Sequence, residues 1–154
     1  MQIEAVHLLQ GKEQQFVFDP EEEAAAEVTL AHVQAYLYDP NVAISKAGAF
    51  KTVAARYGLG KLHVNTHLYT SAKLVEDFPG RTFRVLEVLP FSSKVMKSAA
   101  LPFKKAHVIT RNFPLEAAEL QKRLKLKEGE QGLVMGVTVG SGKVLVVAER
   151  VVIA

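Results

Sequence analysis

The feature that most constrains the fold is a pair of apolar runs near the C-terminus. Val134 to Val139 and Val144 to Val147 are rich in β-branched residues, and Gly140-Ser141-Gly142-Lys143 separates them. β-Branched residues favour strands, and a short glycine-rich link is typical of a hairpin. Because neither run alternates with polar residues, both strands should be substantially buried. The chain is therefore predicted to contain a well-covered sheet.

The turn sequence Asp77-Phe78-Pro79-Gly80 begins the unit that ends in this hairpin. Periodicity predicts a β-α-β-α-β-β order: a mixed sheet with two helices on one face, whose first two strands are parallel and joined by a right-handed crossover. The predicted elements before the hairpin are a strand from Thr82 to Leu89, a helix from Ser92 to Ala100, a strand from Ala106 to Thr110 and a helix from Glu116 to Lys125. The hairpin itself should extend from Leu133 to Val152.

The first half of the chain predicts another small α/β unit, so the fold class is α+β with two units. Strands from Ile3 to Leu9 and from Gln14 to Phe18 form an expected hairpin. The acidic segment from Asp19 to Glu27 is either a linker or a short solvated helix. A strand ending at Tyr38 then meets Asp39-Pro40-Asn41, a helix-start signal, and the helix should continue to Tyr57 with Gly58 as its C-terminal cap.

A continuous strand is expected from Leu62 to Tyr69. Its alternation would place one set of polar and aromatic side chains on a common face: His63, Asn65, His67 and Tyr69. Two histidines on one face could meet an ion or a phosphate. Zinc sites usually need three or four protein ligands, and the chain has no cysteine, so we predict no metal site.

Other apparent catalytic motifs lack residues or structural context that their chemistry needs. Gly58-Leu59-Gly60-Lys61 follows a helix instead of a strand, and capping explains it better than phosphate binding. The link at Gly140 lacks the first glycine and the Ser/Thr of a Walker loop. No glycine-rich turn for binding S-adenosylmethionine (SAM) follows a strand, so we expect no catalytic residue and no cofactor in this chain.

Length and composition allow a real core but give no sign of a membrane protein. The chain has 154 residues, of which 49% are hydrophobic and 23% charged. No apolar stretch approaches the roughly 20 residues of a membrane span, and the N-terminus lacks the pattern of a secretion signal. We therefore expect a cytoplasmic protein without a membrane partner.

Charge is distributed unevenly along the chain. Residues 1–77 carry six Lys/Arg and ten Asp/Glu, whereas residues 78–154 carry thirteen and six. The basic second half could meet a polyanion. The candidate RNA-binding residues are Lys94, Lys97, Lys104, Lys105, Arg111, Lys122, Arg123, Lys125 and Lys127. The alternative for the second helix is that its terminal cations only complement the helix dipole. The nearby Phe91, Phe103 and Phe113 lie at or near prolines and should fix turns to the core, so recognition would be of RNA backbone and shape.

Four sequence blocks resemble a known family: YLYDPNVAISKAGAF from Tyr36 to Phe50, KLHVNTHLYTS, EVLPF and RNFP. The chain resembles the C-terminal region of bacterial SAM-dependent methyltransferases that carry a THUMP-like domain. The resemblance implies an N-terminal hairpin and acidic linker over residues 1–33, similar to the end of a catalytic domain, a ferredoxin-like element over 34–76 and a THUMP-like domain over 78–152. Without cysteine, the ferredoxin-like element can hold no iron–sulfur cluster.

The resemblance also implies a function. The chain would bind structured RNA, such as tRNA or rRNA, and present it to a catalytic methyltransferase domain in cis, which would hold SAM. Two alternatives stay open. The chain could be a docking or dimerisation module that pairs through Val134–Val139 or Tyr36–Tyr38, or a small enzyme if the His63 to Tyr69 face lies in a closed pocket.

Overall fold

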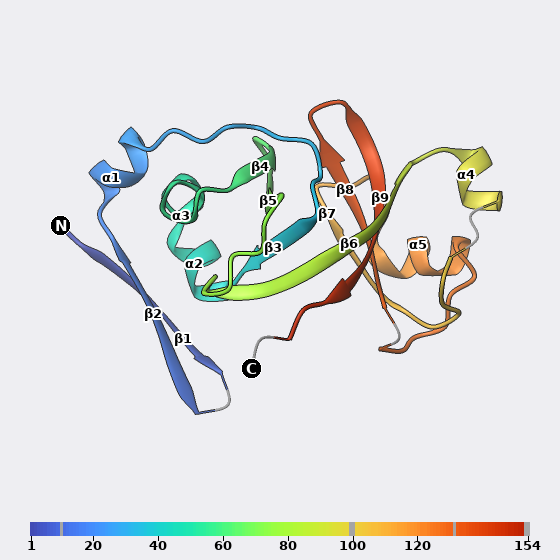
Figure 1. Cartoon of the computed structure of the whole chain (residues 1–154), viewed down its shortest axis with the longest axis horizontal. Coiled ribbons are helices and arrows are strands. Elements are labelled where there is room, and N and C mark those ends of the chain that lie inside the picture. The colour runs from blue at the N-terminus through green and yellow to red at the C-terminus, as the bar shows by residue number, and fades with distance from the viewer. Residues whose placement is uncertain (10, 99–100, 131, 153–154) are drawn as a thin grey trace.

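The computed structural model describes residues 1–154 except 10, 99–100, 131 and 153–154. It confirms the α+β class, with a two-stranded sheet and a seven-stranded mixed sheet. The strand order in the larger sheet is β4-β5-β3-β6-β9-β8-β7. Figure 1 shows the small N-terminal sheet at one end of the molecule and the helices α4 and α5 at the other.

The second unit has the predicted element order. Its elements are β6 (Gly80–Pro90), α4 (Ser93–Ser98), β7 (His107–Arg111), α5 (Ala117–Arg123), β8 (Leu133–Val139) and β9 (Gly142–Arg150). β6 and β8 each pair antiparallel with β9, and β7 pairs parallel with β8. β6 and β7 therefore point in the same direction, as predicted, but β9 and β8 lie between them.

The apolar run that ends the chain is buried as its composition predicts. β8 lies between β9 and β7, and six of its seven residues are buried. Val134 packs on one side of the sheet with Met96 of α4 and Leu120 of α5. Met135 and Val137 pack on the other side. Both helices thus cover one face, and Gly140-Ser141 forms the hairpin turn between Val139 and Gly142.

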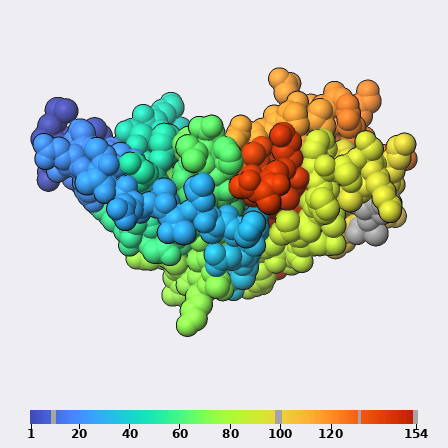
Figure 2. All heavy atoms as spheres, turned by 90° about the horizontal axis from the view of Figure 1, so that it is seen from above, coloured from blue at the N-terminus to red at the C-terminus, as the bar shows by residue number. Residues whose placement is uncertain are grey.

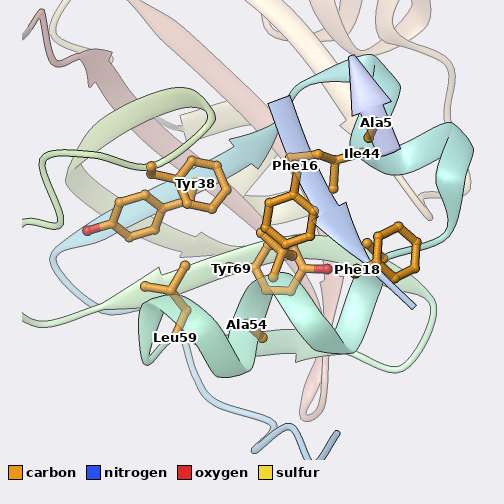
Figure 3. Close-up of a cluster of buried hydrophobic side chains, with 11 residues drawn as sticks. Ala5, Phe16, Phe18, Tyr38, Ile44, Ala54, Leu59 and Tyr69 are labelled. Atoms are coloured by element: carbon orange, nitrogen blue, oxygen red, sulfur yellow. The ribbon is translucent and has the colours of Figure 1, made fainter. Parts of the chain in front are cut away.

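The first unit contains a hairpin, three short helices and three strands. These elements are β1 (Ile3–Leu9), β2 (Lys12–Phe18), α1 (Pro20–Ala25), β3 (Tyr36–Pro40), α2 (Val42–Ala47), α3 (Phe50–Tyr57), β4 (Gly60–His63) and β5 (Thr66–Ser71). The N-terminal hairpin is not detached: Ala5, Phe16 and Phe18 join a buried cluster with Ile44, Ala54 and Tyr69 (Figure 3). Burial of these aromatic rings stabilises the hairpin against the rest of the unit.

The two units share one sheet. β3 pairs antiparallel with β6 from Tyr36↔Arg84 to Pro40↔Gly80. The sheet also folds onto itself, because Leu62 of β4 and Leu68 of β5 share a buried cluster with Val137 of β8. Figures 1 and 2 both show the β8–β9 turn between the first unit and the segment that leads to α4.

The helix predicted to start at Asp39-Pro40-Asn41 and to continue to Tyr57 is wrong in two respects, because it is two helices and its start lies later. Gly48 adopts a left-handed conformation with φ 79° and ends α2, and α3 begins at Phe50. Glycine reaches this conformation at little cost, so it can end a helix even where apolar periodicity continues. Asn41 is the N-cap of α2, since its side chain accepts a hydrogen bond from Ile44 N. Asp39 and Pro40 belong to β3 instead of the helix start.

The predicted strand from Leu62 to Tyr69 is also wrong. The chain turns at Val64-Asn65, and His63 of β4 pairs with Thr66 of β5. A two-residue turn reverses the chain, so alternation does not continue from one strand to the next. His63, Asn65, His67 and Tyr69 consequently do not form one strand face.

The acidic segment is a short helix instead of an extended linker. The Glu23 side chain of α1 accepts hydrogen bonds from Lys51 N and Thr52 N at the start of α3. Ala49, the N-cap of α3, has no side chain that could make these bonds. Glu22 adds an ion pair with Arg56, 2.7 Å between side-chain atoms. In the described part of the chain, no helix is long and apolar enough to cross a membrane.

Candidate nucleic-acid interface

A groove between α4 and α5 brings together three of the predicted RNA-binding residues. Lys97, Arg123 and Lys125 line it, together with Phe91 and Met96, around a volume of about 640 Å³. All three cationic side chains are exposed, and none of the described residues that line the hollow is acidic. We call this surface the α4–α5 groove. Lys97 lies on α4, Arg123 lies on α5 and Lys125 follows α5, and the packing of both helices against one sheet face brings these cations together.

The path of the chain after α5 helps to shape this groove. Leu124 ends the helix, and Lys125 follows with a positive φ of 57°. Leu126 is buried in the core beneath, and its N–H donates to Gln121 O. Arg123 is partly neutralised by Glu119, 3.1 Å away along the same helix. Because this ion pair is exposed, its energy is small and the guanidinium can still meet another anion.

The other lysines of the predicted set are exposed but lie outside the lining of the groove. Lys94 and Lys122 lie on α4 and α5 themselves. Lys105 and Lys127 form a short parallel bridge before β7, and Lys104 O accepts a hydrogen bond from Lys127 N. The Phe91 and Phe113 rings pack at a tilt of 59° with centroids 4.7 Å apart, and Phe103 packs into the same cluster. The three rings therefore fix turns to the core, as predicted.

Arg111 lies at a different site. It ends β7 and lines a larger hollow, about 740 Å³, where the two units meet. We call this hollow the junction cleft. Its charged lining residues are Lys46, Arg81, Arg111, Arg150 and Asp39. Asp39 Oδ2 accepts hydrogen bonds from Arg81 at 2.5 Å and from Arg111 at 3.1 Å.

Close approach of β3 and β6 builds the floor of the junction cleft. Gly80 lies so near Asp39 and Pro40 that an added Cβ would meet the Asp39 carbonyl oxygen. Asn41 N donates to Pro79 O at 3.0 Å, and its side chain donates to Gln14 of the N-terminal hairpin. On the opposite side, Asn112 has φ 50° and donates to Thr66 Oγ1. Both units thus hold the cleft in shape.

Among the cations of this cleft, only Arg111 belongs to the set predicted from the sequence. Arg81 and Arg150 are far apart in the sequence, and pairing of β6 with β9 brings their strand ends together. Lys46 projects from the separate helix α2. No local spacing could have indicated this set, because only tertiary pairing assembles it.

The four polar residues predicted on one strand face are divided. His67 and Asn65 line the junction cleft. His63 Nδ1 accepts a hydrogen bond from Asn65 N in the hairpin turn. Tyr69 is fully buried, and its hydroxyl donates to Phe50 O. The His67 ring stacks on Phe50 with centroids 3.7 Å apart. Burial, and secondarily the nearby Lys61 charge, lower the pKa of His67, so the imidazole is neutral at pH 7.

The described residues contain no cluster of three or more His, Cys, Asp or Glu side chains that could hold a metal ion. The division of His63, Asn65, His67 and Tyr69 also removes the arrangement on which the small-enzyme alternative depended.

Comparison with known proteins matches the chain to two domain families. Residues 36–79 match a ferredoxin-like domain family, and residues 80–150 match a THUMP domain-like family. Two uncharacterized S-adenosylmethionine-dependent methyltransferases, from two strains of Mycobacterium tuberculosis, are each 27% identical over 109 residues, which is 70% of this chain and 30% of theirs. The chain is also similar to a crystal structure from Porphyromonas gingivalis described as a methyltransferase, with a TM-score of 0.92 and 42% identity.

The fold and these matches define an α+β chain of adjoining ferredoxin-like and THUMP-like domains. These are the two domains that the resemblance in the sequence implied, and the relatives are named as methyltransferases, so the resemblance is confirmed. The similarity to the Porphyromonas structure covers 98% of this chain, including the N-terminal hairpin, but only 38% of that chain. The chain thus spans about a third of the length of the relatives it matches.

Proposed function

We propose that this chain is the RNA-binding and substrate-presenting region of a cytoplasmic SAM-dependent RNA methyltransferase. It would hold structured RNA, such as tRNA or rRNA, while a separate catalytic domain binds SAM and transfers the methyl group. The chain itself would supply no catalytic residue. S-adenosylmethionine would bind to the catalytic domain in cis and not to the residues described above.

The observation that carries the proposal is the α4–α5 groove in the THUMP-like domain. Lys97, Arg123 and Lys125 line it, and the lining residues within the described part of the chain include no acidic side chain. Lys94 and Lys122 extend the basic surface along the same two helices. Lysine and arginine side chains that neutralise phosphates are the sequence-independent part of RNA binding. Phe91 lines the groove but packs against Phe113 and the core, which favours recognition of backbone and shape over base stacking.

Docking by strand pairing does not fit the sheet. Pairing through Val134–Val139 or Tyr36–Tyr38 needs an unpaired strand edge. β8 is hydrogen-bonded to β9 and β7, and β3 is hydrogen-bonded to β5 and β6. Neither strand can therefore accept another strand at its edge without breaking the sheet.

A binding experiment with a matched charge control tests the proposal. Fluorescence anisotropy would compare labelled tRNA and rRNA fragments on the wild type, on K97E/K125E and on K12E/K73E. All four lysines are exposed, and both variants change the net charge equally. The proposal predicts that K97E/K125E loses most of its RNA affinity and that K12E/K73E loses little. Equal affinity of the two variants would contradict it.

A further inference from the structure

The junction cleft is a second cationic site, separate from the α4–α5 groove. Four cations line it, Lys46, Arg81, Arg111 and Arg150, and Asp39 is the one acidic residue among the described lining residues. The excess of cations over acidic residues is not a general property of the surface, as a neighbouring hollow of similar size shows. That hollow shares Arg81 and Arg150 but also contains Glu128, Glu130 and Glu149.

Asp39 orients two of the arginines without using up their hydrogen-bonding capacity. One of its oxygens, Oδ2, accepts from both Arg81 and Arg111, and the carboxylate is largely buried. The two arginine side chains are 37% and 39% exposed. A guanidinium has several N–H donors in a fixed fork, so each arginine keeps donors that can bind another anion. A phosphate oxygen in the cleft would meet preorganised donors instead of flexible ones.

The rest of the lining suits a nucleotide better than a bare ion. Asn65 and Asn112 offer amide groups, and the partly exposed Phe50 ring stacks on His67. Single-stranded nucleic acids are held by grooves that combine positive charge for the backbone with aromatic rings for the bases. A hollow of about 740 Å³ lies within the range of sites that bury small organic ligands, roughly 300–1,000 Å³, so it can admit a segment of single strand but not a duplex.

We propose that the junction cleft binds the phosphate groups of a single-stranded RNA segment, through Arg81, Arg111, Arg150 and Lys46. This inference rests on the proposed function, since it adds a second RNA contact between the ferredoxin-like and THUMP-like domains. The two contacts differ in kind: the α4–α5 groove is formed by helices and meets backbone, while the junction cleft has a stacked ring pair and amides beside its arginines.

The test uses the full chain, a hexauridylate and uridine 5′-monophosphate as probes. Backbone amide shifts in ¹H–¹⁵N NMR spectra report where each probe binds, in particular at Asn41, Arg81 and Asn112. The variant R111Q/R150Q removes two cleft cations. Its control is K73Q/R84Q, which removes equal charge and breaks the exposed Arg84–Glu149 ion pair. K46Q provides a further cleft variant that breaks no described ion pair, in case R111Q/R150Q does not fold.

The inference predicts that hexauridylate shifts the cleft amides and that R111Q/R150Q lowers its affinity about tenfold or more, as the loss of one or more charged hydrogen bonds does. K73Q/R84Q should lower it little, and the monophosphate should bind more weakly because it offers one phosphate group. Unchanged cleft amides, equal losses in both variants, or tighter binding of the monophosphate would each overturn the inference. If K97E/K125E still abolishes tRNA binding in those cases, the proposed function stands and only the cleft assignment fails.

Discussion

Asp39 of the ferredoxin-like domain and Arg111 of the THUMP-like domain form an ion pair, 3.1 Å between Oδ2 and Nη2, across 72 positions of sequence. The same carboxylate oxygen holds Arg81 at 2.5 Å. The interface between the domains is therefore a continuous sheet strengthened at one end by a shared, largely buried carboxylate. Loss of this carboxylate should affect both the stability of the chain and the shape of the junction cleft.

Replacement of Asp39 by Asn should lower the free energy of unfolding by about 1–2 kcal/mol, because two charged hydrogen bonds lose their acceptor charge. The arginines are about two-fifths exposed, which keeps the loss below that of a fully buried pair. Glu149→Gln is the control, since it removes the carboxylate of the exposed Arg84 pair. Urea denaturation should show the larger loss for Asp39→Asn, and equal losses would contradict the role assigned to Asp39.

Gly80→Ala should destabilise the chain by about 3 kcal/mol or more, because overpacking here forces backbone apart. The added Cβ would meet the Asp39 carbonyl oxygen and lie 2.9 Å from Pro40 Cα. Gly140→Ala is a suitable comparison, since, apart from its chain neighbours, no described residue lies within 4 Å of its added Cβ. Thermal denaturation would measure both. A Gly80→Ala protein as stable as Gly140→Ala would show that β3 and β6 do not approach as closely as described.

Glu23→Ala should cost about 1–2 kcal/mol, the usual effect of losing a helix cap. The Glu23 carboxylate accepts from Thr52 N at 2.8 Å and from Lys51 N at 3.0 Å. Glu21→Ala removes an exposed acidic residue from the same short helix and should change stability little. Denaturant titration of the two variants distinguishes a capping role from a general effect of the acidic segment, in which case both variants would lose the same amount.

Much of the fold follows from local sequence signals, because those signals coincide with tertiary burial. The run Leu133–Val139 is apolar except at Thr138 and is buried except at Thr138. Gly58 ends α3 in the left-handed conformation, φ 64°. The turn at Val64-Asn65 has no glycine, so nothing local distinguished the β4–β5 hairpin from one continuous strand. Likewise, apolar residues on both sides of Gly48 concealed the break between α2 and α3.

The two binding surfaces differ in how far local sequence predicts them. The cations of the α4–α5 groove lie close together in sequence or on helices that pack side by side, so charge clustering could indicate them. The junction cleft combines residues from α2, β6, β7 and β9. Its assembly depends on the pairing of β3 with β6 and of β6 with β9, and a single sequence does not contain that information locally.

Because of Lys61, the free energy of unfolding should rise with pH in the alkaline range. The side chain is buried, with Nζ donating to His63 O at 2.7 Å and Val64 O at 2.6 Å. Burial lowers the pKa of Lys61 from 10.5 to about 8, although the nearby Glu23 charge opposes the shift. Between these two values the unfolded state binds more protons than the folded state, so the free energy of unfolding rises with pH. Below about pH 8 both states are protonated, and the cost of burying the charge is fully present.

Urea denaturation between about pH 7.5 and 9.5 would measure this rise, below the range where the tyrosines titrate in the unfolded state. Lys61→Met should flatten the profile over this interval. Burial raises the pKa of Tyr57 and of Tyr69 in the folded protein, so these groups lower stability only at higher pH. A wild-type profile without a rise, or a rise that persists in Lys61→Met, would contradict the assignment to Lys61.

The salt dependence of RNA binding tests the central claim most directly. The affinity of the wild type for a tRNA fragment, measured between about 50 and 200 mM salt, should fall linearly on a double-logarithmic plot. K97E/K125E should show a slope shallower by roughly one to two units, because each lost phosphate contact removes about 0.7–0.9, whereas K12E/K73E should keep the wild-type slope. A wild-type affinity that does not change with salt, or equal slopes in all three proteins, would contradict phosphate binding at the α4–α5 groove.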